Sequence, residues 1–441
     1  MAKAATATQS QANTRVRAKV RMYRHGLGDC LLVTLPRKSA GDYHILIDCG
    51  VILGTPNATV LMQGVLSDVA ATTQNKVDLL AATHEHWDHL SGFVQAAGVF
   101  KQLQVGEVWL AWSEDPADPL GRELAGERAA AVAGLRLGAS RMMLAGDHEA
   151  AEIVASLTEF FGAVRGPTTR DALAAVRAKT AAPRYCKPAD DPVEVADTGV
   201  RIYVLGPPRD AKQIKKTLPS KKAPETYGLV QAVFDTHVKP LLAGEPTDIP
   251  FGTFLSIPNA VAEEMDFFKA NYWSYEAWRR IDGSWLDAST ELALQLDSAT
   301  NNTSLVLAVE LEDGDVLLFA ADAQVGNWES WQDLCWTVHG NTVTGPDLLK
   351  RTIFYKVGHH GSHNATLRQD GLEMMEKLRI AAIPVDHAIA VKKGWGQMPL
   401  PALVDALTEK TCGALLRSDA PAPPNVAQSV VSTDRYFEIS L

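Results

Sequence analysis

The segment from Val77 to Gly92, VDLLAATHEHWDHLSG, constrains the fold of this chain more than any other stretch. Its first part, Val77 to Ala82, is short and almost continuously apolar, which is typical of a strand that is buried on both faces. Three histidines and two carboxylates follow directly. Because open α/β sheets keep their chemistry beyond the carboxyl ends of the strands, we expect these polar side chains at such an edge.

The spacing of these side chains indicates a metal site. His84 and His86 are two residues apart, so on extended backbone both imidazoles point to the same side and one divalent ion can bind both. Asp88 and His89 follow at the turn, where they would serve a neighbouring position. Two metal ions a few ångströms apart would then activate a bridging water for hydrolysis. The alternative is a solvated turn, but four candidate ligands within six residues favour metal binding.

The pattern H-x-H-x-D-H after an apolar strand resembles the metallo-β-lactamase superfamily. This resemblance implies an α/β fold, a four-layer αββα sandwich with the metals at one edge of two facing sheets. The run VLLFAADAQ is similar to the superfamily strand that ends in a glycine–aspartate pair, and it implies that Asp322 bridges both metals. Ala321 replaces the glycine, a change that the backbone accepts if φ stays negative. A surface turn is the other interpretation of Asp322.

Further motifs resemble the soluble hydrolase domain of the competence protein ComEC. They are a G-x-G-D turn with Asp29, an I-D-x-G turn with Asp48, and a V-L-G-P-P run at residues 204–208. The two aspartates either orient the metal-bound histidines or only suit a tight turn.

A fourth ComEC-like motif, G-H-H-G-S at residues 358–362, follows a predicted buried strand. Adjacent histidines between glycines allow close approach of backbone and ligand. We assign His359 as the ligand of the second metal because it comes first after the strand. His360 and Ser362 would contact the substrate or steady the ligands, and the roles of the two histidines can be exchanged.

The chain departs from the family pattern just before the strand predicted to follow Thr303. Many members carry another metal-binding histidine there, and this chain has TNNT at residues 300–303. The first metal would then have only His84, His86 and Asp322 from the protein, with water or substrate oxygens completing an oxygen-rich site for zinc or manganese. Asn302 in the same run is a candidate for substrate binding or ligand support.

A second departure lies near the end of the chain. The ComEC pattern has a tyrosine, glycine, histidine and proline before its last helix, whereas residues 395–399 read WGQMP. A histidine that would assist the leaving group is missing, so the resemblance leaves the substrate open.

The apolar and turn patterns predict one large domain over residues 15–441 after a disordered tail at residues 1–14. Two insertions are expected, an alanine-rich helical one at about residues 113–195 and a lid or subdomain at residues 209–300. The second carries an aromatic cluster that is either part of that lid or a satellite core. Leu90 to Phe100 should form one helix, and His148, His237 and His363 are not expected to bind metal. Strands are predicted at 16–23, 30–35, 43–48, 77–82, 107–112, 200–205, 305–310, 315–321 and 351–357.

Composition limits the partners and the compartment. The formal net charge of −10 argues against a surface that grips nucleic acid indiscriminately. Five scattered cysteines without a C-x-x-C pair favour a reducing cytoplasm. No apolar run approaches the roughly 20 residues that span a bilayer, and the first residues lack a secretory core, so no membrane partner is expected.

Together these features predict a metal-dependent hydrolase of the phosphodiesterase or nuclease type, with a phosphoester such as nucleic acid as substrate. Asp88 and His360 are the proposed catalytic residues. The alternatives are a hydrolase of lactams, lactones or thioesters and a non-catalytic metal-binding interaction protein. Oligomeric state is not indicated. The two divalent ions, zinc or manganese, are expected to be held by His84, His86, Asp88, His89, Asp322 and His359.

Overall fold

The computed structural model describes residues 16–145, 148–162, 166–216, 257, 259–275, 296–393 and 395–441. The tail at residues 1–14, His237 and much of the long insertion lie outside the described residues. Every predicted strand is present with bounds shifted by a few residues, and the mixed α/β class is confirmed.

Within the described residues the strands form two large sheets and a small two-stranded ribbon. In sheet order, the first sheet contains β16 (Val430–Ser432), β17 (Tyr436–Ser440), β1 (Lys19–Tyr23), β2 (Leu31–Pro36), β3 (Asp42–Ile47), β4 (Lys76–Ala82), β5 (Gln104–Ala111) and β6 (Arg184–Cys186). The second contains β15 (Leu415–Arg417), β14 (Ile380–Ile383), β13 (Thr352–Lys356), β10 (Val316–Phe319), β9 (Val306–Glu310), β8 (Val200–Gly206) and β7 (Val193–Val195). The ribbon pairs β11 (Cys335–Val338) with β12 (Asn341–Thr344).

Strand direction brings the sequence motifs to one edge. In the first sheet β3, β4 and β5 run parallel, and in the second β10 and β13 run parallel. Strand β2 is antiparallel to β3, with Leu31 opposite Ile47, so the start of β2 lies beside the end of β3. We call the edge where β3, β4, β10 and β13 end the site edge.

The core explains why the buried strands are apolar on both faces. One cluster of buried side chains lies between the sheets, with Val33 and Ile45 from the first sheet packed with Leu307 and Leu317 from the second. A second cluster covers the other face of the second sheet, and a third covers the other face of the first. Alternate residues of one strand therefore enter different apolar layers, as the near-continuous runs predict.

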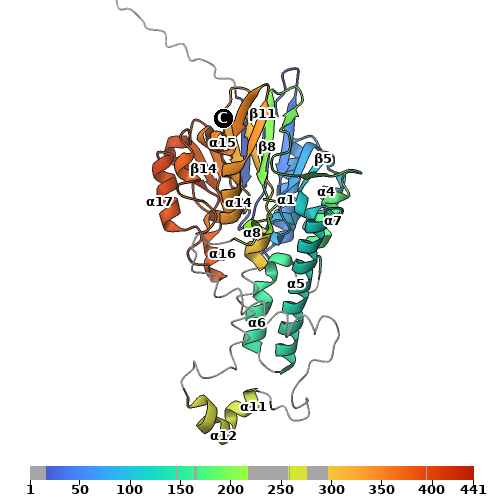
Figure 1. Cartoon of the computed structure of the whole chain (residues 1–441), viewed down its shortest axis with the longest axis vertical. Helices are drawn as coiled ribbons and strands as arrows, with labels where there is room; N and C mark the ends of the chain where they lie inside the picture. The colour runs from blue at the N-terminus through green and yellow to red at the C-terminus, as the bar shows by residue number, and fades with distance from the viewer. Residues whose placement is uncertain are drawn as a thin grey trace, which may run out of the picture.

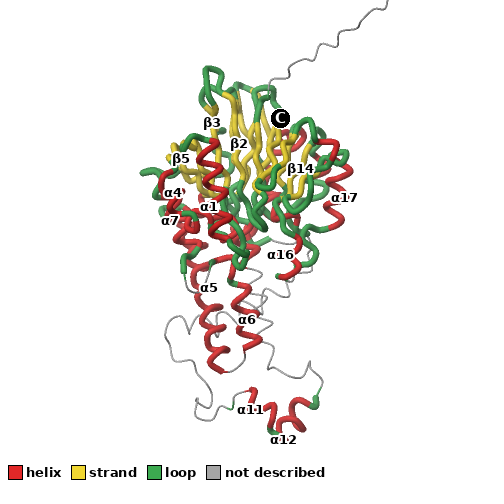
Figure 2. The backbone as a smooth tube through the Cα atoms, turned by 180° about the vertical axis from the view of Figure 1, so that it is seen from behind, coloured by secondary structure: helices red, strands yellow, loops and turns green. Residues whose placement is uncertain are grey.

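Helices cover the outer faces of both sheets (Figures 1 and 2). On the first sheet they are α1 (Ala58–Thr72), α3 (Gly92–Gln95), α4 (Ala97–Gln102) and α7 (Thr169–Arg177). On the second they are α14 (Val325–Ser330), α15 (Gly345–Lys350), α16 (His387–Lys392) and α17 (Pro401–Lys410). Other described helices are α2 (Trp87–Leu90), α5 (Pro119–Ala145), α6 (His148–Leu157), α8 (Ala211–Ile214), α11 (Asn259–Glu264) and α12 (Asp266–Phe268), with a π-helical turn at Lys269–Trp273. Residues 296–301, before β9, are also helical.

The prediction of one helix from Leu90 to Phe100 is wrong. The region forms the separate pieces α2, α3 and α4. The hydroxyl of Ser91 bonds both the backbone N–H and the carbonyl of Val51, and the N–H of Gly92 donates to Cys49 O. These bonds hold the start of the segment against the loop after β3, which breaks the helical ladder.

The range predicted as a helical insertion, about residues 113–195, contains both helices and short strands. Helices α5 and α6 pack against each other and extend away from the sheets, as Figure 1 shows; we call them the helical pair. The rest of the predicted range contributes α7 to the cover of the first sheet and places β6 and β7 at sheet edges. His148 begins α6 and is exposed, in agreement with its exclusion from the ligand set.

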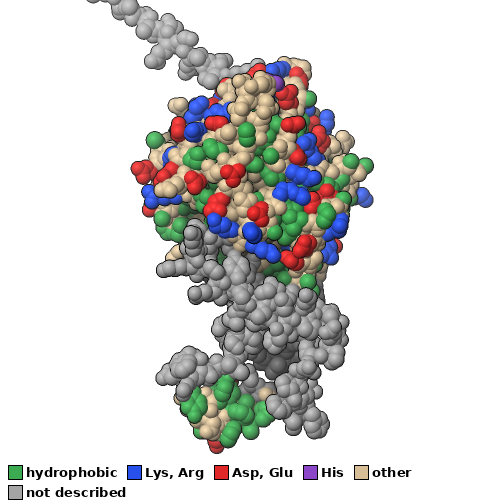
Figure 3. All heavy atoms as spheres, viewed as in Figure 1, with side chains coloured by type: hydrophobic (Ala, Val, Ile, Leu, Met, Phe, Trp, Pro, Cys, Tyr) green, Lys and Arg blue, Asp and Glu red, His purple; other side chains and the backbone are tan. Residues whose placement is uncertain are grey.

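On the face drawn in Figure 3, basic and acidic side chains of the described residues are interspersed. No helix of the described residues is both long enough and apolar enough to cross a membrane. All five cysteines are unpaired; Cys30, Cys49 and Cys186 are buried, whereas the other two are exposed.

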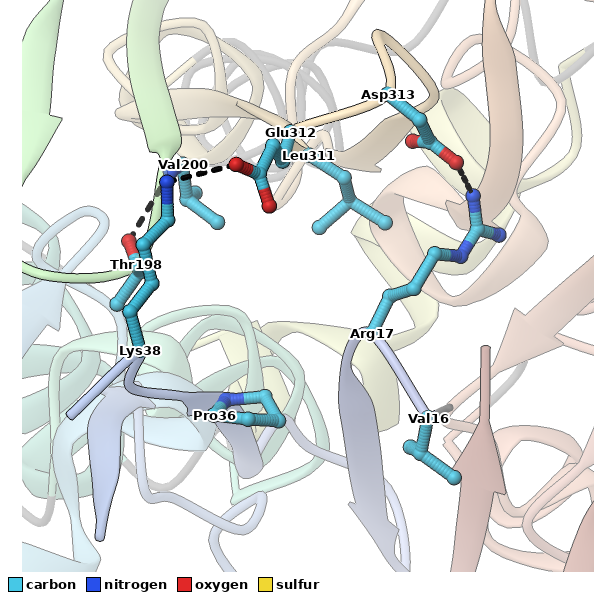
Figure 4. A pocket seen from close by; sticks show the side chains of 9 residues that line it. All are labelled: Val16, Arg17, Pro36, Lys38, Thr198, Val200, Leu311, Glu312 and Asp313. Atoms are coloured by element: carbon cyan, nitrogen blue, oxygen red, sulfur yellow. Dashed lines mark hydrogen bonds and ion pairs between the residues drawn. The ribbon is translucent and has the colours of Figure 1, made fainter. Parts of the chain in front are cut away.

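A cavity of about 240 Å³ lies where β2 ends at Pro36 (Figure 4). This is the end of β2 opposite Asp29, roughly 20 Å from the site edge along the strand. Its cations Arg17 and Lys38 are paired with Asp313 and Glu312. These four groups are therefore all paired, and the cavity lies far from the histidines at the site edge.

Candidate metal centre

Loops from both sheets bring four ionisable side chains together at the site edge. Asp88 and His89 follow β4, Asp322 follows β10, and His360 follows β13. One ligand atom from each lies within 4.8 Å of the other three, and all four residues are buried. We call them the four-residue cluster. Residues far apart in the sequence thus meet as the motifs predicted.

Distances within the four-residue cluster match shared coordination. Nε2 of His360 lies 3.0 Å from Oδ2 of Asp88, and Nε2 of His89 lies 3.2 Å from Oδ2 of Asp322. Two atoms bound tetrahedrally to one ion at about 2.1 Å are roughly 3.4 Å apart. The cluster therefore needs only small shifts to hold a metal ion.

Hydrogen bonds to Asp48 set two histidine tautomers. His89 Nδ1 lies 2.8 Å from Asp48 Oδ2, so the ring donates there and leaves Nε2 free for the cluster. Thr83 donates its hydroxyl to the same carboxylate at 2.6 Å, and its oxygen then accepts from His84 Nδ1 at 3.1 Å. Nε2 of His84 is thereby left as an acceptor. Of the two roles that the sequence left open for Asp48, these hydrogen bonds favour orientation of the histidines over a tight turn alone.

The remaining histidine of the four-residue cluster is fixed by a backbone carbonyl. His360 donates from Nδ1 to Pro384 O at 2.6 Å, which again leaves Nε2 facing the carboxylates. The same rule therefore holds for His84, His89 and His360: one ring nitrogen is committed to an oxygen acceptor and the other is available to a metal.

His84 and His86 form a separate histidine pair. Nε2 of His84 and Nδ1 of His86 lie 3.0 Å apart, so the two rings converge on one point through different nitrogens. Neither belongs to the groups of three or more mutually close ligand atoms found among the described residues. The division into a first and a second metal position stays a prediction, and the histidine pair offers two protein nitrogens for the first.

His359 lies outside the four-residue cluster, which corrects the expected assignment. Its ring nitrogens face the amides of Asn301 and Gln324, each at 3.4 Å. Its backbone N–H instead reaches Asp322 Oδ1 at 3.2 Å. The exchanged assignment therefore fits better, because His360 takes the position given to His359. Both residues have positive φ, 42° and 52°, and this backbone turns the two rings apart.

Lys356 and Asp29 form a buried ion pair next to Asp322 and His89 of the four-residue cluster. The ammonium of Lys356, 1 % exposed, pairs with Asp29 and lies 3.4 Å from Asp322 Oδ1 and 2.9 Å from Ala321 O. Asp29 also approaches His89 Nδ1 at 3.8 Å. Because Asp29 already has this cation and Asp48 is hydrogen-bonded to His89, the close group Asp29, Asp48 and His89 acts as support. Lys356 was not predicted, since a strand lysine normally indicates a solvated face.

Electrostatics divide the histidines into neutral and charged ones. Burial lowers the pKa of His84 well below its usual value and that of His86 to about 3. Burial also opposes charge on His89, but Asp322 and other carboxylates raise its pKa well above the usual value. The pKa of His360 is raised for the same reason. Despite burial, His89 and His360 in turn hold the pKa of Asp322 well below its usual value.

Asn302 and Ser362, which were predicted to support the ligands or bind substrate, do not contact the four-residue cluster in the hydrogen bonds that they form. The amide of Asn302 donates to Ile214 O at 2.9 Å and Lys216 O at 2.8 Å, and its oxygen accepts from Gln324 N at 2.9 Å. Asn302 therefore joins α8 to the loop after β10 through backbone bonds. The hydroxyl of Ser362 lies 3.5 Å from Nδ1 of His363, and neither residue belongs to the four-residue cluster.

Ala321 does not have the negative φ that was expected. Its φ is 47°, in the left-handed region that favours the glycine of the family pattern. The N–H of His359 and the ammonium of Lys356 both donate to its carbonyl, at 3.1 Å and 2.9 Å. These bonds hold the strained turn that presents Asp322.

Asp297 joins the site although the sequence did not indicate it. It belongs to residues 296–301, which are helical and precede β9. Its Oδ1 lies 3.7 Å from His86 Nε2, and burial together with Asp88 and Asp322 raises its pKa well above the usual value. The signal available in the sequence was the run TNNT at residues 300–303, which has no histidine or carboxylate and so leaves a ligand partner to come from the preceding residues.

Several buried polar atoms around these residues have no hydrogen-bond partner among the described residues. They are Asp29 Oδ1, His86 Nε2, Asp88 Oδ1, His89 Nε2, Asp297 Oδ1, Asn301 Oδ1 and Gln324 Oε1. An unsatisfied buried polar group costs about 1–3 kcal/mol, and a cation held by the four-residue cluster would satisfy Asp88 Oδ1 and His89 Nε2. Buried histidines and aspartates at the site edge can thus hold a metal ion.

An ion-pair network attaches the helical pair to the segment after β4, residues 83–89, which we call the ligand loop. Arg128 of α5 donates to Glu85 Oε2 at 2.6 Å and to Glu114 Oε1 at 3.1 Å. Glu85 lies between the paired histidines and also accepts from the hydroxyl of Thr169 at 3.0 Å. The loop therefore has support from the insertion as well as from the sheet.

Gly50 lies against the backbone of the ligand loop, with no room for a side chain. A Cβ at Gly50 would lie 2.5 Å from Asp88 C and 2.5 Å from His89 N. Gly50→Ala is therefore expected to push this loop outwards and to destabilise the metal-free protein by about 1–3 kcal/mol in urea unfolding. Gly98→Ala is the control, because nothing lies within 4 Å of its Cβ. Equal unfolding midpoints for both variants would contradict the close-contact argument.

Comparison with known proteins adds no assignment. No family model matches the chain, no curated protein matches it, and no solved structure matches it.

Proposed function

We propose that this protein is a metal-dependent hydrolase with two divalent ions, zinc or manganese, and that its substrate is a phosphodiester. The observation that carries the proposal is the convergence of buried histidines and carboxylates from loops of two sheets. Imidazole and carboxylate ligands suit both metals. We further propose that the two sheets and their outer helices are the four-layer αββα sandwich of the metallo-β-lactamase superfamily, in a ComEC-like branch.

Each part of the site has a distinct task in this proposal. His84 and His86 would hold the first ion, Asp88, His89 and His360 would hold the second, and Asp322 would serve as a ligand in both sets. When bound, such ions lower the pKa of water and neutralise charge on the attacked group. Asp48 and Thr83 hold the histidine tautomers, while Lys356 balances the charge of Asp29 and Asp322.

A phosphodiester is the favoured substrate class because a paired site can hold its two non-bridging oxygens and offset the charge that develops on them. The mixed charges on the face in Figure 3 and the net charge of −10 do not favour broad binding to a polyanion. A small phosphodiester or a short single strand therefore fits better than duplex nucleic acid.

The test is hydrolysis of bis(p-nitrophenyl) phosphate by purified protein supplied with Mn²⁺ or Zn²⁺. Nitrocefin, a lactone and a thioester are assayed in parallel, followed by single-stranded DNA. Turnover of a phosphodiester with loss on chelation is the expected result. Turnover of the lactam or the esters alone would assign the alternative hydrolase class, and metal binding without any turnover would indicate an interaction protein.

Metal affinity is expected to rise with pH. A histidine that binds a metal must be neutral, so His89 and His360, whose pKa values are raised, have to release protons. The apparent affinity should increase by up to about tenfold per pH unit for each proton released, until the pH passes the raised values. Calorimetry in buffers of different ionisation enthalpy gives the proton count. An affinity that is constant between about pH 6 and about pH 8 would exclude charged histidines in the metal-free site.

The same pKa shifts affect the metal-free protein in the opposite sense. A raised histidine pKa adds stability that is complete below the ordinary value and is lost as the pH rises through the raised one. The metal-free protein should therefore melt at lower temperature as the pH increases over this range. The metal-loaded protein should not show this loss.

A further inference from the structure

The two nitrogens of His86 face different partners. Nδ1 lies 3.0 Å from Nε2 of His84, which is the direction of the proposed first metal. Nε2 points the other way and lies 3.7 Å from Oδ1 of Asp297. His86 thus reverses the arrangement of His84, His89 and His360, in which Nδ1 donates and Nε2 is left for the metal.

The facing atoms lack other partners. His86 Nε2 and Asp297 Oδ1 are both buried and form no hydrogen bond with any described residue. His86 is 1 % exposed, so water does not readily replace a missing acceptor. At 3.7 Å the pair is slightly too long for a hydrogen bond, and a shift of about half an ångström would close it.

Asp297 is anchored so that its carboxylate stays near this position. Its other oxygen accepts from the amide of Asn301 at 3.2 Å, one helical turn further along. The preceding residue, Leu296, packs against the apolar contact between α5 and α6, which includes Leu135 and Val154. The carboxylate is therefore carried by a segment that is fixed on both sides.

Aromatic side chains also restrict the orientation of the His86 ring. Its centroid lies 5.2 Å from that of Phe160 and 5.3 Å from that of Phe161, and Phe160 stacks on Trp395 at 5.1 Å. These contacts restrict rotation of the imidazole but supply no acceptor for its N–H. The carboxylate of Asp297 is the group that can select which nitrogen carries the proton.

We propose that Asp297 is the positioning residue for His86, accepting its Nε2–H and leaving Nδ1 unprotonated for the first metal. This inference rests on the proposed two-metal function and supplies support where the family histidine is missing. Asp297 faces the nitrogen directed away from His84, so it acts through His86. A direct ligand would have to lie on the Nδ1 side.

The experiment is Co²⁺ titration of the full chain, followed by calorimetry and by the visible cobalt bands, with no substrate present. Asp297→Ala is expected to weaken one of the two sites by about 10–100-fold, the usual effect of losing such a partner, with both ions still bound at saturation. Asp297→Asn keeps an acceptor oxygen and should recover most of the affinity. Asp266→Asn, an exposed carboxylate of the same insertion, is the control and should bind as the parent does.

The other outcomes overturn the inference. Loss of one ion at saturation together with altered cobalt bands would make Asp297 a direct ligand, and unchanged affinity for both ions would remove it from the site. If Asp297→Ala does not fold, the long-range ¹⁵N spectrum of His86 in Asp297→Asn decides, since an unchanged tautomer and affinity there would also overturn it. Because no turnover is measured, failure of this inference is distinct from failure of the hydrolase proposal.

Discussion

Asp322→Asn is expected to reduce phosphodiester hydrolysis at least about a hundredfold, because even an outer partner of a metal ligand has an effect of up to that size. Asp322 approaches both histidines of the four-residue cluster, with its Oδ2 3.2 Å from His89 Nε2 and 3.7 Å from His360 Nε2. Asparagine keeps the shape but removes the negative charge that lies between the two proposed ions. Turnover is measured at saturating Mn²⁺, so that weak binding is not mistaken for slow chemistry.

The control for this variant is Asp313→Asn at the distant cavity. Like Asp322, Asp313 lies in a turn and is close to a basic side chain, here Arg17. It lies at the opposite end of the strands from the site edge. Its removal should leave turnover within about twofold because a distant exposed pair contributes little. If Asp322→Asn retained parental turnover with both ions bound, the central carboxylate would have no part in the reaction.

Arg128→Met is expected to destabilise the protein by about 3–5 kcal/mol, the cost of leaving a buried charge without its partner. Arg128 is 6 % exposed and neutralises both Glu85 and Glu114. Methionine fills much of the volume but leaves two carboxylates close together. Burial already raises the pKa of Glu114 in the parent, and loss of the arginine raises it further.

The pH dependence of this variant identifies the cause. A carboxyl whose pKa is raised on folding destabilises the folded state at neutral pH, and the loss shrinks as the pH falls and the group takes a proton. Urea unfolding at neutral and acidic pH should therefore show a smaller difference from the parent in acid. Arg122→Met, on the exposed side of the same helix, is the control. A loss that does not change with pH would indicate packing alone.

Local patterns predicted the parts of the site that are close in sequence. Val77 to Ala82 had to be a buried strand, and the spacing of His84, His86, Asp88 and His89 then fixed their common location. The C-terminal ends of parallel strands also brought Asp322 and the histidine doublet to the same edge. These inferences needed only strand periodicity and strand direction.

Features that depend on backbone turns or distant contacts were not predictable in this way. The choice between His359 and His360 follows from two consecutive left-handed residues, which no periodicity signals. Lys356 looks like a surface residue until Asp29 is placed beside it. Asp297 approaches His86 only because the segment before β9 packs on the helical pair.

The left-handed histidine doublet has a consequence for engineering. Each non-glycine residue in this conformation costs about 1–2 kcal/mol, so the loop lowers the melting temperature. The same conformation directs the His360 ring to the carboxylates and the His359 ring to two amides. Libraries selected only for heat resistance should accumulate glycine at residues 359 and 360. Such clones would survive the screen without the proposed metal ligand His360, so a screen for the proposed activity has to score turnover and thermal tolerance together.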